Sequence, residues 1–144
     1  MSTSTNNIQA QREAVVKAHI KAEAVDHSVA ATVATFRHPR YEVPALAVIA
    51  DGAQPVEGLV SGLLAAFPDF YLRPKTFHHA ENAVVVEVTF GGTHRGIWAG
   101  IAPTGKKMEV ESVLIFVFEN ADLVCEKVYF DHATILHQLG ASIH

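Results

Sequence analysis

Cysteine, charge and long apolar runs are all scarce in this sequence of 144 residues, and each shortage excludes a class of protein. The single cysteine, Cys125, excludes a disulfide framework and a zinc site made of cysteines alone. No apolar run approaches the roughly 20 residues that a membrane-spanning helix needs. The net charge is −4 and the basic residues do not cluster beyond the pair Lys106-Lys107, so a nucleic-acid partner is not expected.

Apolar residues, by contrast, are abundant: 49% of the chain is hydrophobic and only 18% is charged. This composition excludes an intrinsically disordered protein, and the length suits one domain, residues 1–144, with a core of its own. The Ser/Thr/Asn-rich residues 1–6 are expected to be disordered. They carry neither the basic nor the apolar segment of a secretory signal, so we expect a soluble, cytoplasmic protein.

Helical patterns come first along the chain. Residues 8–35 are rich in helix-forming residues and are expected to form two helices or one bent helix. Residues 55–67 carry the clearest helical pattern, because Pro55 suits the first position, large apolar residues recur at spacings of three and four, and Pro68 follows.

Strand patterns follow in residues 71–131. Alternating apolar residues predict an antiparallel meander there, with a turn at Gly91-Gly92 and a separate strand over 94–101. Residues 132–140 are predicted to form a short closing helix. Helices followed by a meander indicate an α+β fold. We therefore expect N-terminal helices packed in the concave side of a strongly curved, mostly antiparallel sheet, a cone-shaped barrel.

Three segments resemble the SnoaL-like polyketide cyclase family, part of the nuclear transport factor 2-like, cystatin-like superfamily. They are AAFPDF (65–70), GGTHRGIWAGIAPTGKK (91–107) and LVCEKVYFDHATILHQLG (123–140). The resemblance covers about residues 10–140, and its order of elements agrees with the helix and strand patterns. It departs from the family at Val128, where many members have tryptophan, and at Lys106, where arginine is usual. Both departures concern the substrate more than the fold.

The resemblance also implies a reaction. Founding members close a ring on a polyketide ester without a cofactor, using an aspartate near the end of the last strand as acid/base. The matching residue is Asp131, and the Gly-Thr-His word of the family places His94 at the rim of the predicted third strand. Family members commonly pair through the open face of the sheet, so a homodimer is implied.

Two interpretations are open for Asp131. A general base in an apolar pocket needs a raised pKa. An aspartate that caps the closing helix is bonded to backbone N–H groups, and its pKa is lowered. His94 and Trp98 are expected on one face of a predicted strand, where His94 would orient a carbonyl or transfer a proton. The alternative for His94 is a rim histidine that is bonded to the backbone.

Further residues are candidates for the pocket wall. Glu111 would pair with Asp131 or His94, or it marks where its strand meets solvent. Tyr129 shares a strand face with Asp131 and would donate its hydroxyl to an enolate oxygen, or it is a core aromatic. Trp98 and aromatic residues of the sheet, Phe116 among them, would exclude water from the pocket.

No cofactor and no metal ion are expected. His78 and His79 are adjacent on a predicted strand and point to opposite faces, and His132 and His137 lack the i, i+4 spacing of helical metal sites. The expected ligand is a hydrophobic small molecule with a carbonyl group, and the expected reaction is a cofactor-independent cyclisation or isomerisation. The alternative is a non-catalytic ligand-binding or dimeric interaction module of the same fold.

Overall fold

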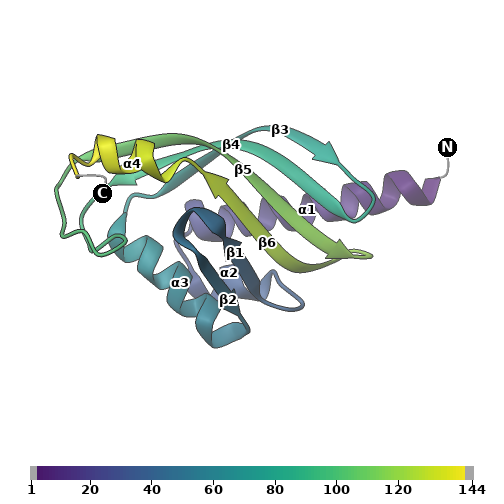
Figure 1. The fold of residues 1–144 in the computed structure, drawn as a ribbon. Helices are drawn as coiled ribbons and strands as arrows, with labels where there is room; N and C mark the ends of the chain where they lie inside the picture. The colour runs from purple at the N-terminus through teal and green to yellow at the C-terminus, as the bar shows by residue number, and fades with distance from the viewer. Residues whose placement is uncertain (1–2, 142–144) are drawn as a thin grey trace.

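The computed structural model of the chain describes residues 3–141. Its first half contains α1 (Thr3–Ala24), α2 (Val29–Ala34), β1 (Arg40–Val43), the 3-10 helix η1 (Pro44–Leu46), β2 (Val48–Asp51) and α3 (Ala53–Ala66) (Figure 1). Its second half contains β3 (Tyr71–His79), β4 (Ala83–Thr93), β5 (Lys107–Glu119), β6 (Asp122–Phe130) and α4 (His132–Gln138).

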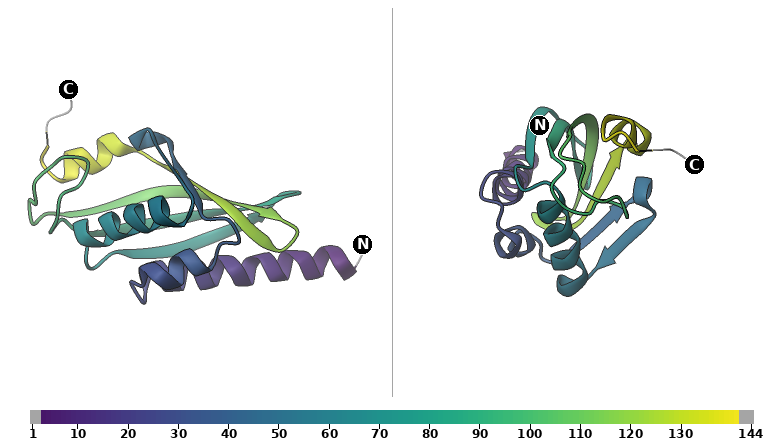
Figure 2. Two further views of the ribbon diagram at one scale, coloured as in Figure 1. Left: turned by 90° about the horizontal axis from the view of Figure 1, so that it is seen from below. Right: turned by 90° about the vertical axis from the view of Figure 1, so that its left-hand side faces the viewer.

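The strands form one six-stranded sheet in the order β2-β1-β6-β5-β4-β3. Neighbouring strands are antiparallel except β1 and β6, which are parallel. The sheet curls, and α1 and α3 lie across the same face of its long strands, as the view from below shows (Figure 2). The expected α+β fold, with helices in the concave side of a curved and mostly antiparallel sheet, is confirmed.

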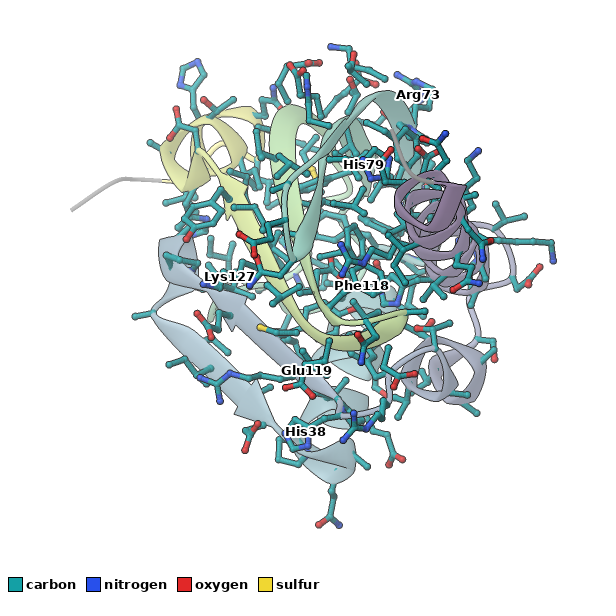
Figure 3. All side chains as sticks on the ribbon, turned by 90° about the vertical axis from the view of Figure 1, so that its right-hand side faces the viewer. His38, Arg73, His79, Phe118, Glu119 and Lys127 are labelled. Carbon is teal, nitrogen blue, oxygen red and sulfur yellow. The ribbon has the colours of Figure 1, made fainter. Side chains whose placement is uncertain are left out.

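Inward-facing side chains of the neighbouring strands β4 and β5 build the core. Val84 and Val86 of β4 are fully buried, and β5 places Phe116 and Leu114 beside them in register. On the helix side, Val56 of α3 is fully buried in the same cluster. Side chains on the other face of the sheet, such as the exposed end of Arg73 on β3, lie at the outer surface (Figure 3).

β4 continues past the point where the sequence predicts a turn. Gly91 and Gly92 lie inside the strand and pair with Glu109 and Met108, so the prediction of a turn there is wrong. Close packing explains the glycine at position 91, because a Cβ there would lie 2.5 Å from the carbonyl oxygen of Met108. The glycine signal at this position therefore reflects a close approach of two strands.

The predicted strand over residues 94–101 is also wrong. These residues belong to the long connection between β4 and β5, which contains one isolated bridge between Trp98 and Ile101. Ala99 and Gly100 at its tip both have positive φ, of 48° and 80°, which is the backbone of a tight two-residue turn. His94 and Trp98 therefore do not share a strand face.

A β-bulge in β6 decides which of its side chains face the concave side. Val117 of β5 pairs with Cys125, but the next residue of β5 pairs with Leu123, so Val124 has no partner in that ladder. The extra residue reverses the alternation along the rest of the strand. The residues that face inward after the bulge are Glu126, Val128 and Phe130.

The ends of the elements differ slightly from the expected ones. α1 begins at Thr3, inside the segment 1–6 that the sequence predicts to be disordered, and residues 1 and 2 lie outside the described residues. The strand β1 has no counterpart among the predicted elements. Within residues 3–141, no helix combines the length and the apolar character needed to cross a membrane.

Candidate functional site

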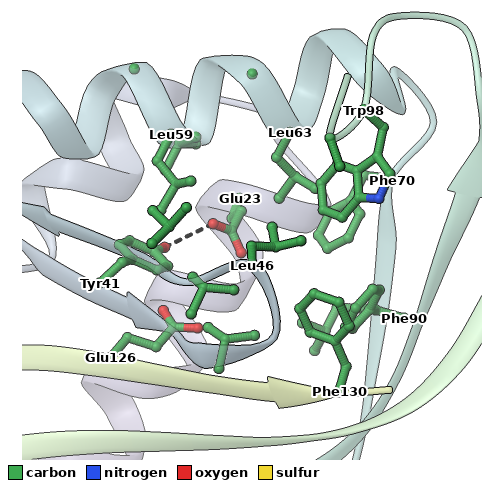
Figure 4. A pocket seen from close by; sticks show the side chains of 18 of the residues that line it. Glu23, Tyr41, Leu46, Leu59, Leu63, Phe70, Phe90, Trp98, Glu126 and Phe130 are labelled. Atoms are coloured by element: carbon green, nitrogen blue, oxygen red, sulfur yellow. Dashed lines mark hydrogen bonds between the residues drawn. The ribbon is translucent and has the colours of Figure 1, made fainter. Parts of the chain in front are cut away.

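A cavity of about 550 Å³ opens on the concave side of the sheet. Its walls are mainly apolar and come from α3, from β1 to β6, and from the connection between β4 and β5 (Figure 4). Apolar side chains of the walls include Leu46, Leu59, Leu63, Phe70, Phe90, Trp98 and Phe130. Such a cavity suits an apolar small molecule with few polar groups.

Polar side chains gather at one end of this cavity. Glu23 of α1, Tyr41 of β1 and Glu126 of β6 line it, and Glu23 and Tyr41 point toward one another (Figure 4). His19 lies behind them, one turn before Glu23 on α1. Each of the four side chains is at most 5% exposed, so their charges interact through the protein interior.

These four side chains are connected by short contacts. The Tyr41 hydroxyl donates to Glu23 Oε2 at 2.8 Å, and its oxygen lies 3.0 Å from His19 Nε2. The same His19 nitrogen lies 2.8 Å from Glu126 Oε1. On the other side of the ring, His19 Nδ1 lies 2.8 Å from Thr35 Oγ1, just after α2. Side chains from α1, from the end of α2, from β1 and from β6 therefore meet at this end.

Burial and neighbouring charge shift the proton affinities of the cluster. Burial, with the negative charge of Glu126 added, raises the pKa of Glu23 to about 7 against the smaller opposing effects of His19 and Tyr41. Burial also raises the pKa of Tyr41 well above its usual range. Burial lowers the pKa of His19, but the Glu126 and Glu23 carboxylates outweigh burial, so that pKa is raised overall.

The arrangement suits proton transfer without a cofactor. A carboxyl group with a pKa near 7 can both accept and donate a proton at neutral pH, which is the property of a general acid/base. Tyr41 places a hydroxyl beside it that could donate to an oxygen of a bound molecule. The apolar walls would keep water away from both groups.

Trp98 is the predicted site residue that lines this cavity. Its ring packs against Phe67 and Phe130, with centroids 5.4 and 6.5 Å away. His94 is fully buried behind the cavity, where its Nδ1 accepts a hydrogen bond from the Thr104 backbone N–H at 3.2 Å. It does not line the cavity, because β4 ends at Thr93 and the next side chain turns into the core.

Phe116 is a core residue and not a cavity wall. It is fully buried, and its ring centroid lies 5.5 Å from that of His19. The contact with His19 places it directly behind the polar end of the cavity, where it shields the cluster from solvent.

Asp131, Tyr129 and Glu111 come together elsewhere, in a shallow hollow of about 710 Å³ lined from the outer face of the sheet. Tyr129 is 44% exposed there, as the β6 bulge requires. Glu111 binds Lys75 and accepts from the Thr89 hydroxyl, and the hydrogen bonds from these two side chains lower its pKa. The structure thus brings these three residues together, but not with His94.

Asp131 is the N-cap of α4. Its carboxylate accepts from the Ala133 backbone N–H at 3.1 Å and from the Thr134 hydroxyl at 2.8 Å. The Thr134 hydroxyl is the main cause that lowers the pKa of Asp131, with backbone N–H groups adding to it. A carboxylate held in this way is a weak base, so the geometry favours the capping interpretation, and the catalytic role of Asp131 stays a prediction.

Two of the four histidines considered as metal ligands, His78 and His79, lie against carboxylates. His78 lies 2.7 Å from Glu87, and His79 is bonded to Glu13 of α1, beside which it lies (Figure 3). Within residues 3–141, no group of three or more His, Cys, Asp or Glu side chains has an arrangement that could hold a metal ion.

Sequence reasoning missed the polar cluster, although α1 carries a signal for it. His19 and Glu23 recur at helical spacing on the same face as the buried Val16 and Ile20, so two ionisable residues lie within an apolar stripe. Ionisable residues on a buried helix face are rarely there without a partner. Glu126 carried no such signal, because the bulge decides its direction.

The chain has recognisable relatives. The family model for the SnoaL-like polyketide cyclase matches residues 14–139. Among curated proteins, none matches the sequence.

Solved structures share the fold. A candidate SnoaL-like polyketide cyclase from Jannaschia sp. CCS1 has a TM-score of 0.82 and 17% identity, over 93% of this chain and 94% of that one. AclR, a candidate hydroxylase from Streptomyces galilaeus, has a TM-score of 0.76 and 23% identity, over 91% and 82%. TerC, co-crystallised with polyporic acid, has a TM-score of 0.72 and 14% identity, over 91% and 99%. At these identities the likeness is one of fold.

Proposed function

The chain belongs to the SnoaL-like polyketide cyclase family, and from this premise we propose that it catalyses proton transfer on an uncharged, largely apolar carbonyl compound. One observation carries the proposal: a buried carboxyl group whose pKa is about 7, Glu23, lies at the end of an apolar cavity. Co-crystallisation of TerC, a protein of the same fold, with polyporic acid supports a small organic ligand for this chain.

The proposed reaction uses the two side chains that point toward one another. Ionised Glu23 takes a proton from the carbon next to the carbonyl group, so a C–H bond breaks and an O–H bond forms on the carboxylate. Tyr41 turns its hydroxyl from Glu23 to the developing enolate oxygen and stabilises its charge. Glu23 then returns the proton, to another carbon in an isomerisation or to the oxygen of a second carbonyl that the enolate carbon has attacked in a cyclisation.

Deuterium exchange would test this step before the natural substrate is known. Carbonyl-bearing aromatic, steroid-like and polyketide-like compounds are first screened by thermal shift. A compound that binds is then incubated with the protein in D2O, and loss of the proton next to its carbonyl group is followed by NMR. We expect exchange with the natural chain, and a loss of at least about 100-fold in Glu23→Gln.

The matched control is Asp131→Asn, which changes the other candidate base in the same way. We expect this variant to exchange at the rate of the natural chain, because Asp131 lies in the outer hollow and caps α4. Exchange that survives in Glu23→Gln and is lost in Asp131→Asn would contradict the proposal and support the role that the resemblance implies for Asp131.

A non-catalytic ligand carrier is the second candidate. It is favoured by the way the polar groups satisfy one another, since Tyr41 is already bonded to Glu23 and His19 already lies against Glu126. A carrier would bind the same class of compound, but bound compounds would show no exchange above the rate in buffer.

A further inference from the structure

Both ring nitrogens of His19 have hydrogen-bonding neighbours, and these neighbours together determine the protonation of the ring. On one side, Thr35 Oγ1 donates its single proton to the carbonyl oxygen of Thr32 at 2.7 Å. That oxygen can therefore only accept from His19 Nδ1, which lies 2.8 Å away. Nδ1 carries a proton in this arrangement.

The contacts of the second ring nitrogen, Nε2, indicate that it is protonated as well. Nε2 faces two oxygens, Glu126 Oε1 at 2.8 Å and Tyr41 Oη at 3.0 Å. The single proton of Tyr41 is donated to Glu23 Oε2, so the tyrosine oxygen has only lone pairs to offer His19. While Tyr41 donates to ionised Glu23, Nε2 carries a proton as well, and His19 is an imidazolium.

The surroundings show which groups stabilise this charge. His19 is 1% exposed, and the rings of Phe36 and Phe116 stand edge-on to it at 5.3 and 5.5 Å. The titratable groups that face it are Glu23 from α1, Tyr41 from β1 and Glu126 from β6. A buried cation needs a nearby carboxylate and hydrogen-bond acceptors: Glu126 places its charge 2.8 Å from Nε2, and Thr35 accepts from Nδ1.

We infer that Thr35 and His19 are positioning residues for the acid/base Glu23. Thr35 holds His19 as an imidazolium, and the imidazolium holds the Tyr41 oxygen so that its proton is directed at Glu23. It also balances the charge of Glu126, which would otherwise act on Glu23 alone and raise its proton affinity further. The positioning role rests on the proposed function of Glu23, whereas the protonation of His19 rests on its contacts alone.

The protonation of His19 can be measured without any ligand. In the natural chain, labelled with ¹⁵N and assigned through the backbone, both ring nitrogens of His19 are expected to show imidazolium shifts at pH 7. The midpoint of its titration is expected above the ordinary histidine value of 6.5. A single unprotonated ring nitrogen at pH 7 would overturn the inference, whatever happens to exchange in Glu23→Gln.

Variants then test the role of Thr35. Thr35→Val removes the acceptor for Nδ1 and is expected to move the His19 midpoint to lower pH, and Thr35→Ser is expected to restore it. Thr104→Val removes the hydroxyl beside the other buried histidine, His94, and is the matched control. It should leave His19 unchanged.

The pH profile of ligand exchange gives the functional readout. The exchange rate is expected to rise with pH as Glu23 ionises. In Thr35→Val the imidazolium is lost, so this rise is expected at higher pH. At pH values below the rise, exchange should be about tenfold slower for each pH unit by which the rise is displaced. If the His19 midpoint and the exchange profile of Thr35→Val both coincide with those of the natural chain, Thr35 has no positioning role. Exchange that persists in Glu23→Gln instead contradicts the proposed function.

Discussion

Glu23 is the residue whose burial has the largest consequence for stability. Its pKa is about 7 in the folded protein, against an ordinary 4.5, so the folded state holds this proton more tightly than the unfolded state does. The stability that comes from the protonated form is complete below about pH 4.5 and is lost as the pH rises through 7. The difference corresponds to about 3 kcal/mol in the free energy of unfolding.

Glu23→Gln should remove this dependence, because glutamine can accept from Tyr41 and never ionises. From pH 5 to pH 8, we expect the free energy of unfolding of the variant to rise by roughly 2 to 3 kcal/mol relative to that of the natural chain, measured by urea unfolding. Comparing the two proteins at each pH cancels the contribution of carboxylates elsewhere. A stability difference that is the same at both pH values would show that the pKa of Glu23 is not raised.

Asp131 changes stability with pH in the opposite direction to Glu23. Its pKa is lowered by the Thr134 hydroxyl and by backbone N–H groups of α4, so its contribution to stability is present above its ordinary pKa of 3.8 and is lost as the pH falls. Asp131→Ala is expected to lower the Tm by a few degrees at pH 7, because it removes the cap of α4. The loss should shrink toward pH 3 in calorimetric scans. An unchanged Tm at pH 7 would contradict the capping role.

At the scale of the element, two strands show how far the sequence could predict the site. The alternation on β5 predicts which side chains are buried, because every second residue from Met108 to Phe118 is buried. On β6 the same rule places Tyr129 inside and Glu126 outside. The extra residue Val124 reverses both, and a bulge of this kind depends on pairing with β5, which no local pattern in β6 reveals.

Glycine in the sequence is likewise an ambiguous signal, because it can mark a turn or a close approach of two segments. Gly91-Gly92 has the composition of a turn but lies within a strand, because packing leaves no room for a Cβ there. Gly58 in α3 is the contrasting case, since a Cβ at that position would meet nothing within 4 Å. A glycine inside a helix destabilises it relative to alanine by up to about 1 kcal/mol.

Substitutions at two glycines should therefore change stability in opposite directions. Gly58→Ala is expected to raise the Tm by about 3 °C. Gly96→Ala is expected to lower it, because the new Cβ would lie 2.3 Å from the carbonyl oxygen of Ala65 at the end of α3. Differential scanning calorimetry of both variants checks the pair. A destabilised Gly58→Ala would mean that this face of α3 is packed in solution.

At the scale of the whole molecule, the fold was predictable and the site was not. The order of helical and strand periods indicates the α+β cone, and three sequence segments indicate the family. The polar cluster joins α1, β1 and β6, and two of its members lie more than 80 residues apart in the chain, Tyr41 and Glu126. Only the parallel pairing of β1 with β6, which closes the curl, brings them together.

The homodimer implied by the resemblance belongs to this scale as well and stays a prediction. Pairing through the open face of the sheet would cover the hollow that holds Tyr129 and Asp131. Sedimentation equilibrium checks it, and Tyr129→Lys is expected to shift the equilibrium toward the monomer, because it would place an unpaired charge in the interface. A monomer at high micromolar concentration would contradict it.

The charge of the cavity predicts which ligands the molecule accepts. Among the described residues that line it there is no lysine or arginine, whereas Glu23 and Glu126 lie at its end. Burying a carboxylate there would place like charges together without a partner, so the free-energy penalty is several kcal/mol. An uncharged ketone of the same shape avoids that penalty.

A matched pair of probes tests this selectivity, namely 2-acetonaphthone and 2-naphthoate at pH 8. A ligand at about 100 times its Kd stabilises the native state by about 2.7 kcal/mol, so the ketone should give a clear rise in Tm. The naphthoate should give little or none, because its carboxylate would have to lie near Glu23, which is ionised at that pH. Leu63→Trp, which fills the cavity, should abolish the ketone shift, whereas Ser61→Trp on the exposed side of α3 should leave it. Equal shifts for ketone and carboxylate would mean that the charges at this end do not govern binding.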